Sequence, residues 1–163
     1  MNFKGVEFKK LEFSGNELDG KKYKIEVAEI WNGEVKEKHT IIDTSEFPVQ
    51  RISGDSFQIQ VLSELTAENT LKMMFRFPFP GFSVTREFDA LDRNDYSLRY
   101  AHLQQETAIK PGESFFLLNY ILPYEENGVK HYCAVDQSGS DVYGWGEEFG
   151  IEHYLVITMS FND

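Results

Sequence analysis

The sequence predicts an all-β protein, mainly antiparallel, folded as a single-domain sandwich or barrel of about 8–10 strands with little helix. Three observations support this class. Apolar and polar residues alternate along much of the chain, Asn-Gly pairs separate the alternating runs, and no long helical pattern interrupts them. A length of 163 residues fits one domain spanning residues 1–163.

The alternation is clearest in residues 21–31, 56–63 and 70–77. A period of two is typical of strands that bury one face. With the turn positions, it predicts strands at 3–13, 21–31, 34–42, 56–63, 70–77, 82–89, 114–122, 130–136 and 151–161. The apolar parity of these strands predicts a core of Ile25, Val27, Phe57, Ile59, Val61, Phe75, Phe116, Leu118, Val156 and either Thr158 or Ile157.

Two Asn-Gly pairs predict tight hairpin turns. Asn32-Gly33 lies directly between the strands predicted at 21–31 and 34–42, and Asn127-Gly128 precedes the strand predicted at 130–136. A type I′ turn needs positive φ at both central residues, which Asn and Gly tolerate best.

Three segments depart from simple alternation. Residues 114–121 are apolar on both parities, which predicts a central strand covered on both faces. Residues 95–105 favour a strand, although Asp95 could instead cap a helix. Residues 78–82 hold two prolines, which predicts a turn whose Phe79 and Phe82 fold back onto the core.

The charge is strongly negative and uneven. The chain has 27 Asp and Glu residues against 16 Lys and Arg, a formal net charge of −11. Residues 104–163 contain ten acidic residues and two lysines. Such a field repels nucleic acid and anionic membranes and attracts basic proteins. We therefore expect neither a nucleic-acid partner nor a membrane partner.

Cysteine usage and the N-terminus bear on the compartment. The only cysteine, Cys133, leaves no intrachain disulfide, which fits a reducing compartment. The N-terminal residues lack the apolar run of a signal peptide, and no stretch approaches the roughly 20 apolar residues of a membrane span. The sequence thus predicts a cytoplasmic protein.

No complete catalytic or cofactor motif is present, so we expect no enzyme activity, no cofactor and no metal. His131, Cys133 and His153, with Glu152, could hold zinc, but the spacings of familiar zinc modules are absent. A Cys133–His nucleophilic pair lacks any supporting motif, and Cys133 is interpreted as a small buried apolar residue. The glycines of residues 144–150 have the wrong spacing for a dinucleotide site.

The segment 136–150 is the strongest candidate contact surface. Four glycines make it conformationally permissive, and its aromatic residues are interleaved with carboxylates, a composition suited to docking on a basic protein. Alternatively, the aromatics cap one end of the sandwich while the acids face water. Together with the tip of the second hairpin, the predicted partner-binding residues are Glu125, Glu126, Asp136, Asp141, Tyr143, Trp145, Glu147, Glu148 and Phe149.

These features favour a binding module that neutralises a basic partner. Its size, its acidity and its lack of chemical motifs resemble those of bacterial immunity proteins, which inhibit cationic toxins such as nucleases, although no sequence motif is shared. Three alternatives remain open: a β-barrel that holds a small apolar ligand, an enzyme assembled from scattered residues, and a structural subunit of a larger assembly.

Overall fold

The structure is a computed structural model of residues 1–163, and it describes residues 2–3, 5–46, 51–78, 82–100, 110–132 and 142–163. The predictions made for Phe79, Cys133, Asp136 and Asp141, and for residues 101–105, lie outside the described residues.

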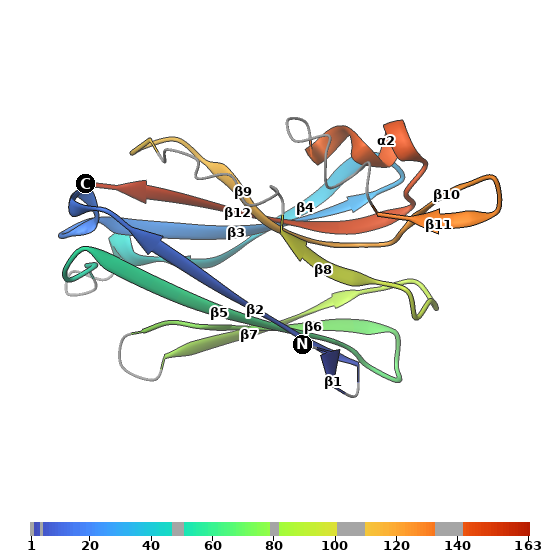
Figure 1. Cartoon of the computed structure of the whole chain (residues 1–163), viewed down its shortest axis with the longest axis horizontal. Coiled ribbons are helices and arrows are strands. Elements are labelled where there is room, and N and C mark those ends of the chain that lie inside the picture. The colour runs from blue at the N-terminus through green and yellow to red at the C-terminus, as the bar shows by residue number, and fades with distance from the viewer. Residues whose placement is uncertain (1, 4, 47–50, 79–81, 101–109, 133–141) are drawn as a thin grey trace.

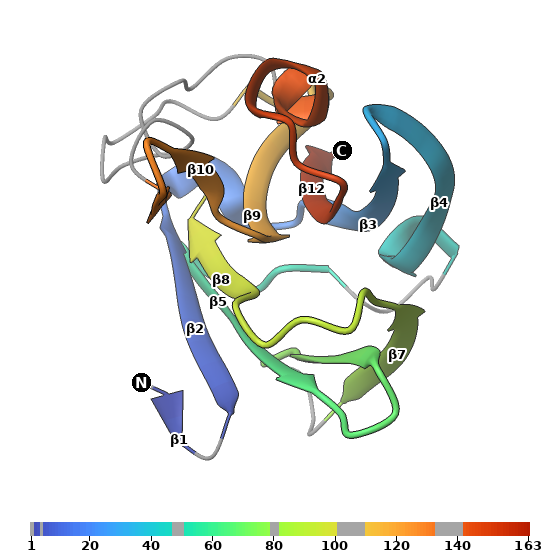
Figure 2. The same ribbon diagram turned by 90° about the vertical axis from the view of Figure 1, so that its right-hand side faces the viewer.

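Two five-stranded antiparallel sheets face each other (Figures 1 and 2). Sheet A has the order β1-β2-β5-β6-β7, with bounds Asn2–Phe3, Val6–Ser14, Ser56–Leu65, Thr70–Arg76 and Ser83–Asp89. Sheet B has the order β4-β3-β12-β9-β8, with bounds Glu34–Asp43, Lys22–Trp31, His153–Asn162, Phe115–Ile121 and Ser97–Tyr100. The all-β, antiparallel prediction is confirmed, and the described strands form a sandwich rather than one closed barrel.

Short elements complete the fold. A separate hairpin consists of β10 (Tyr124–Glu126) and β11 (Val129–His131). The described residues also form the short 3-10 turns η1 (Asn16–Leu18), η2 (Thr44–Glu46) and η3 (Val142–Gly144) and the short helix α2 (Trp145–Phe149). Among the described residues, no helix has the length and apolar character that crossing a bilayer requires.

The two sheets also meet along both sides. On one side, the backbone N–H of Leu98 in β8 donates to Glu7 Oε2 in β2 at 2.7 Å. On the other, the His39 ring in β4 packs edge-on against Phe88 in β7, with ring centroids 5.3 Å apart. Side chains rather than backbone pairing therefore close the sandwich.

Most of the predicted core is confirmed. Phe57 is 7% exposed, and the other confirmed residues are completely buried: Ile25, Val27, Ile59, Val61, Phe75, Leu118, Val156 and Ile157. Phe116 and Thr158 are only half-buried, because they pair across β9 and β12 on the outer face of sheet B. For Phe116 the core prediction is wrong, and of the last pair Ile157 is the core residue.

Several local predictions need correction. The strand predicted at 3–13 is divided into β1 and β2, with Gly5 at φ +78° between them. The ambiguous segment 95–105 contains β8, as favoured, and α2 was not foreseen. Phe82 is 37% exposed and only touches the buried Phe77, so its expected place in the core is wrong.

Candidate partner-binding surface

The segment containing η3 and α2 covers part of the outer face of sheet B (Figure 1). Trp145 is 0% exposed and lies 6.4 Å, between ring centroids, from the buried Tyr154 of β12. Val142 and Ile30 are also buried here. The ring of Trp145 is therefore not exposed to a partner, and for this residue the alternative interpretation holds, in which the aromatics cap the sandwich, because the large apolar ring fills the space between α2 and the sheet.

A backbone contact fixes where α2 begins. A Cβ atom on Gly146 would stand 3.0 Å from Gly33 Cα and 3.2 Å from the Ile151 carbonyl oxygen, so only glycine fits without displacement. Gly33 occupies the β3–β4 turn, where Asn32 and Gly33 both have positive φ, as the hairpin prediction requires. The Asn32 N–H donates to the Glu152 carbonyl at 2.8 Å, which ties this turn to the chain after α2.

The Tyr154 hydroxyl joins the segment to sheet B. It donates to the Val142 carbonyl oxygen at 2.7 Å and accepts from the Gly146 N–H at 3.1 Å. At the other end of α2, Gly150 adopts a left-handed conformation with φ +67°, and the Ile151 N–H donates to the Gly146 carbonyl. A five-residue helix is too short to be stable alone, so these tertiary contacts hold it.

The β10–β11 hairpin lies beside α2. The rings of Tyr124 and Phe149 are 5.2 Å apart, and Tyr124 also contacts the His131 ring at 5.7 Å. All three side chains are half-buried. The two parts of the candidate surface, which were predicted from separate segments, are therefore brought together in the fold.

Four carboxylates flank the two aromatic residues along the chain, with Glu125 and Glu126 after Tyr124 and Glu147 and Glu148 before Phe149. Glu125, Glu126, Glu147 and Glu148 are all exposed, and none forms an ion pair with another described residue. We name these four residues, together with Tyr124 and Phe149, the acidic end. Like charges that lack counter-charges among the described residues are available to a basic partner.

The nearest lysine of the hairpin is already engaged. Lys130 Nζ lies 2.8 Å from Asp95 Oδ2, and Arg93 forms two hydrogen bonds to the same carboxylate at 2.9 and 2.6 Å. Burial alone would raise the pKa of Asp95, but the hydrogen bonds from Arg93 and Lys130 outweigh it and hold the pKa below its usual value. Lys130 is thus directed to Asp95 instead of to the cross-strand Glu125.

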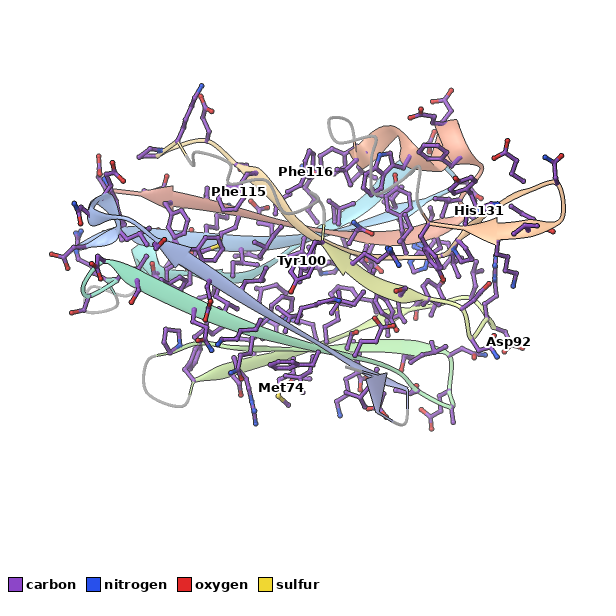
Figure 3. All side chains as sticks on the ribbon, viewed as in Figure 1. Met74, Asp92, Tyr100, Phe115, Phe116 and His131 are labelled. Carbon is purple, nitrogen blue, oxygen red and sulfur yellow. The ribbon has the colours of Figure 1, made fainter. Side chains whose placement is uncertain are left out.

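Tyr143 lies apart from the acidic end, at the margin of the segment that covers sheet B. Its ring contacts Phe116 edge-on at 5.4 Å, and Lys38 Nζ stands 5.4 Å from its centroid. Phe116 lies on the side of sheet B that carries α2 (Figure 3). These side chains line a pocket of about 360 Å³ with Glu26 and Thr158.

His153 belongs to the interior and not to a zinc site with His131 and Glu152. Its ring is fully buried, stacks on Trp31 at 3.9 Å and lies 2.6 Å, through Nδ1, from the Tyr96 hydroxyl. Burial lowers the pKa of His153 to about 4. Within the described residues, the candidate ligands of the predicted alternative do not assemble, and Cys133 lies outside them.

A second pocket lies at the other end of the sandwich. Its volume is about 230 Å³, and its walls are Tyr23, Arg51, Ile52, Ser53, Ser56, Phe57 and Pro78. The Tyr23 and Phe57 rings are 4.6 Å apart and belong to the core, so this part of the pocket wall is apolar.

Sequence reasoning did not find Tyr124, or the β3–β4 turn as the support of α2. An aromatic residue three positions before Asn127-Gly128 was the available signal for Tyr124, because a hairpin strand holds such a ring close to its tip. No signal was available for the Gly33–Gly146 contact, since it joins residues far apart in the sequence.

Comparisons with known proteins give no relative: no family model, no curated protein and no solved structure matches this chain.

Proposed function

We propose that this chain is a protein-binding module whose acidic end binds a basic protein, and that it acts as an immunity protein against a cationic bacterial toxin such as a nuclease. The observation that supports the proposal is the group of four exposed carboxylates, unpaired among the described residues, that flank the contacting Tyr124 and Phe149 along the chain. No catalytic role is proposed for any residue.

Charge and apolar area have separate roles in this proposal. The carboxylates attract a cationic partner and pair with its Arg and Lys side chains, and such steering raises association rates to about 10⁸–10⁹ M⁻¹s⁻¹ at low salt. Tyr124 and Phe149 supply apolar surface in the same area, and the 54%-exposed Val129, cross-strand from Glu126, adds to it. Aromatic side chains such as Tyr are enriched among the interface residues that contribute most of the binding energy.

The acidic end is also held firmly by the rest of the fold. Trp145 is buried under α2, and Gly146 packs against the backbone of the β3–β4 turn. A surface that is already ordered loses little conformational entropy when a partner binds. This rigidity supports a recognition role for Glu147 and Glu148, which project from α2.

The charge contribution can be tested by reversing it at one end of the molecule. Glu147→Lys with Glu148→Lys should slow association with a captured basic partner and flatten its dependence on salt, measured by surface plasmon resonance at low and high salt. The matched control is Glu17→Lys with Glu46→Lys, which makes the same net change at two exposed positions on η1 and η2. Equal effects of the two double variants would show that the attraction comes from the net charge of the whole chain, and would reject the acidic end as a local binding surface.

The apolar contribution has its own test. Phe149→Ala should weaken binding by at least about 2 kcal/mol if the ring is a central anchor. Circular dichroism and thermal melting of the variant show whether α2 and the sandwich persist. Tight binding that is unchanged by Phe149→Ala and by Tyr124→Ala would move the interface away from this contact.

The small-ligand alternative has one observation in its favour, the pocket beside Tyr23 and Phe57. Its volume of about 230 Å³ is below the roughly 300–1,000 Å³ of most ligand sites. A copurifying apolar molecule, or a melting shift on adding small apolar compounds that is lost in Phe57→Leu, would favour this alternative over the binding module.

A further inference from the structure

The pairing of β3 with β4 places two glutamates directly opposite each other. A β-bulge between Glu29 and Ile30 shifts the register, so that Glu29 pairs with Glu37 and Val27 pairs with His39. Residues two apart on a strand share a face. Glu37 and His39 therefore lie on the same face as Glu29, the face of sheet B that is directed toward sheet A.

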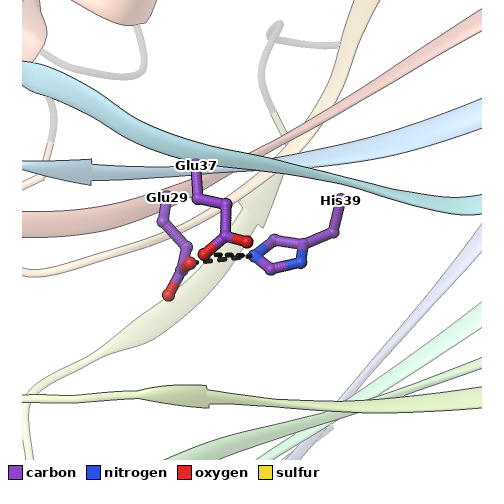
Figure 4. A group of neighbouring side chains, drawn as sticks. All are labelled: Glu29, Glu37 and His39. Atoms are coloured by element: carbon purple, nitrogen blue, oxygen red, sulfur yellow. Dashed lines mark hydrogen bonds and ion pairs between the residues drawn. The ribbon is translucent and has the colours of Figure 1, made fainter.

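The three side chains converge on one point (Figure 4). His39 Nε2 is 2.8 Å from Glu29 Oε2 and 3.7 Å from Glu37 Oε2, and one ligand atom from each residue lies within 4.8 Å of the others. On a tetrahedral zinc ion, with bonds of about 2.0–2.1 Å, ligand atoms stand roughly 3.3 Å apart. The two observed distances lie on either side of that value, so small rotamer changes suffice to bind an ion.

The group is buried on one side and open on the other. The Glu29 side chain is 11% exposed, that of His39 29% and that of Glu37 62%. Phe88 of β7 packs against the His39 ring, which limits its rotation. An ion could enter from the Glu37 side while Glu29 and His39 hold fixed positions.

The charges call for a cation. Like charges directly opposite on paired strands destabilise a sheet, and a buried carboxylate costs more to leave without a counter-charge. The ion-pair contacts that the described residues give to Glu29 and Glu37 are those with His39. With a neutral imidazole, the two carboxylates carry two negative charges, which a divalent ion balances.

The donor set selects the kind of ion. Imidazole nitrogen suits zinc and other late transition metals, whereas Mg²⁺ and Ca²⁺ prefer oxygen donors alone. Three protein ligands with a fourth position open is a common zinc arrangement. We propose that Glu29, Glu37 and His39 form a binding site for a divalent transition-metal ion, with Zn²⁺ the best fit, independently of the acidic end.

Isothermal titration of the full chain with ZnCl₂, after removal of any copurifying metal by chelator, tests the proposal. We expect one equivalent of Zn²⁺ to bind with an affinity that falls at least 100-fold in Glu29→Gln and in His39→Gln. Glu37→Gln changes an exposed side chain, so it should fold normally and still weaken binding about 10-fold or more.

Two control variants make the assignment specific. His131→Gln removes another histidine, on the β10–β11 hairpin, and Glu26→Gln removes a carboxylate on the opposite face of β3. Both should bind Zn²⁺ as the unaltered chain does. Nuclear magnetic resonance should show the His39 imidazole nitrogen signals shifting with stoichiometric Zn²⁺, a change that does not depend on any variant folding.

Either of two results would overturn the proposal. The absence of Zn²⁺ binding would leave the group as a His–Glu ion pair without metal affinity. Binding that persists unchanged in Glu29→Gln, Glu37→Gln and His39→Gln would place the ion elsewhere in the chain.

Discussion

The two sheets of the sandwich differ in their outer faces. In sheet A, β5 and β6 alternate strictly between buried and more exposed residues, because their outer face meets solvent. In sheet B, residues 153–157 of β12 are buried on both parities, because one parity faces sheet A while the other, which includes Tyr154, faces η3 and α2. Met74, on the outer face of sheet A, points away from the other sheet (Figure 3).

This difference locates the specialised part of the molecule. Solvent supplies hydrogen bonds to the polar residues on the outer face of sheet A, so no other segment of the chain has to cover this face. The outer face of sheet B is covered by a segment that also presents Glu147, Glu148 and Phe149. The cover thus has a buried side that completes the core and an exposed side that belongs to the proposed partner-binding surface. Substitutions on the two outer faces should consequently have very different effects.

The largest effect is expected for Trp145→Ala. The ring is fully buried between α2 and sheet B, and removing such a side chain costs about 3–5 kcal/mol of unfolding free energy. Urea denaturation followed by circular dichroism measures the change. Phe149→Ala, at the exposed side of the same helix, is the control and should cost clearly less. Equal costs would contradict the separation into a buried and an exposed side.

His153, on the inner face of β12, should make stability depend on pH. Its pKa is about 4 in the folded protein and 6.5 in the reference state, so the unfolded chain takes up the proton first as pH falls. Above pH 6.5 the neutral imidazole makes its full contribution to the unfolding free energy. Roughly 3 kcal/mol of that free energy is lost as the pH falls from 6.5 to about 4.

The variant His153→Gln isolates this contribution. Glutamine does not titrate, so the difference in unfolding free energy between the unaltered chain and the variant should shrink steadily from about pH 7 to about pH 4.5. Denaturant titrations across this range supply the measurement. A difference that stays constant over the whole range would show that His153 does not titrate as the buried site requires.

The intermediate effect belongs to the contact between α2 and the β3–β4 turn. Gly146→Ala places a methyl group 3.0 Å from Gly33 Cα, and the resulting overpacking should cost about 1–3 kcal/mol. A Cβ at Gly128 meets no atom within 4 Å, so Gly128→Ala carries only the strain of its positive φ. A smaller loss for Gly146→Ala than for Gly128→Ala would show that α2 shifts freely over the turn.

The alternating strands could be predicted because a single cause, one buried face, sets their pattern. Ile59 and Val61 alternate with Gln58 and Gln60, and this parity alone assigns the core face of β5. The exposure of Glu147 and Glu148 was equally accessible, since carboxylates are rarely buried without partners.

Two features were beyond sequence reasoning for identifiable reasons. The glycine-rich segment shows no alternation of apolar and polar residues, and α2 is too short to show a helical period. The burial of Trp145 could therefore not be predicted from the sequence. A regular register from the Asn32-Gly33 turn pairs Glu29 with Lys36. Because of the β-bulge, Glu29 pairs with Glu37 instead of Lys36, and no residue pattern near the turn predicts the bulge.

The smallest effect is expected on the open face of sheet A. Lys72 of β6 is exposed and lies directly between Glu64 of β5 and Glu87 of β7, yet no ion pair within 4.0 Å joins it to a described residue. Exposed charges at such separations contribute little, so Lys72→Gln should lower the unfolding free energy by about 0.5 kcal/mol or less. The loss should disappear at high salt, because screening removes what attraction exists. Thermal melting at low and high salt measures both quantities. A salt-independent loss above about 1 kcal/mol would mean that this face is shielded from solvent, and the contrast between the two sheets would then fail.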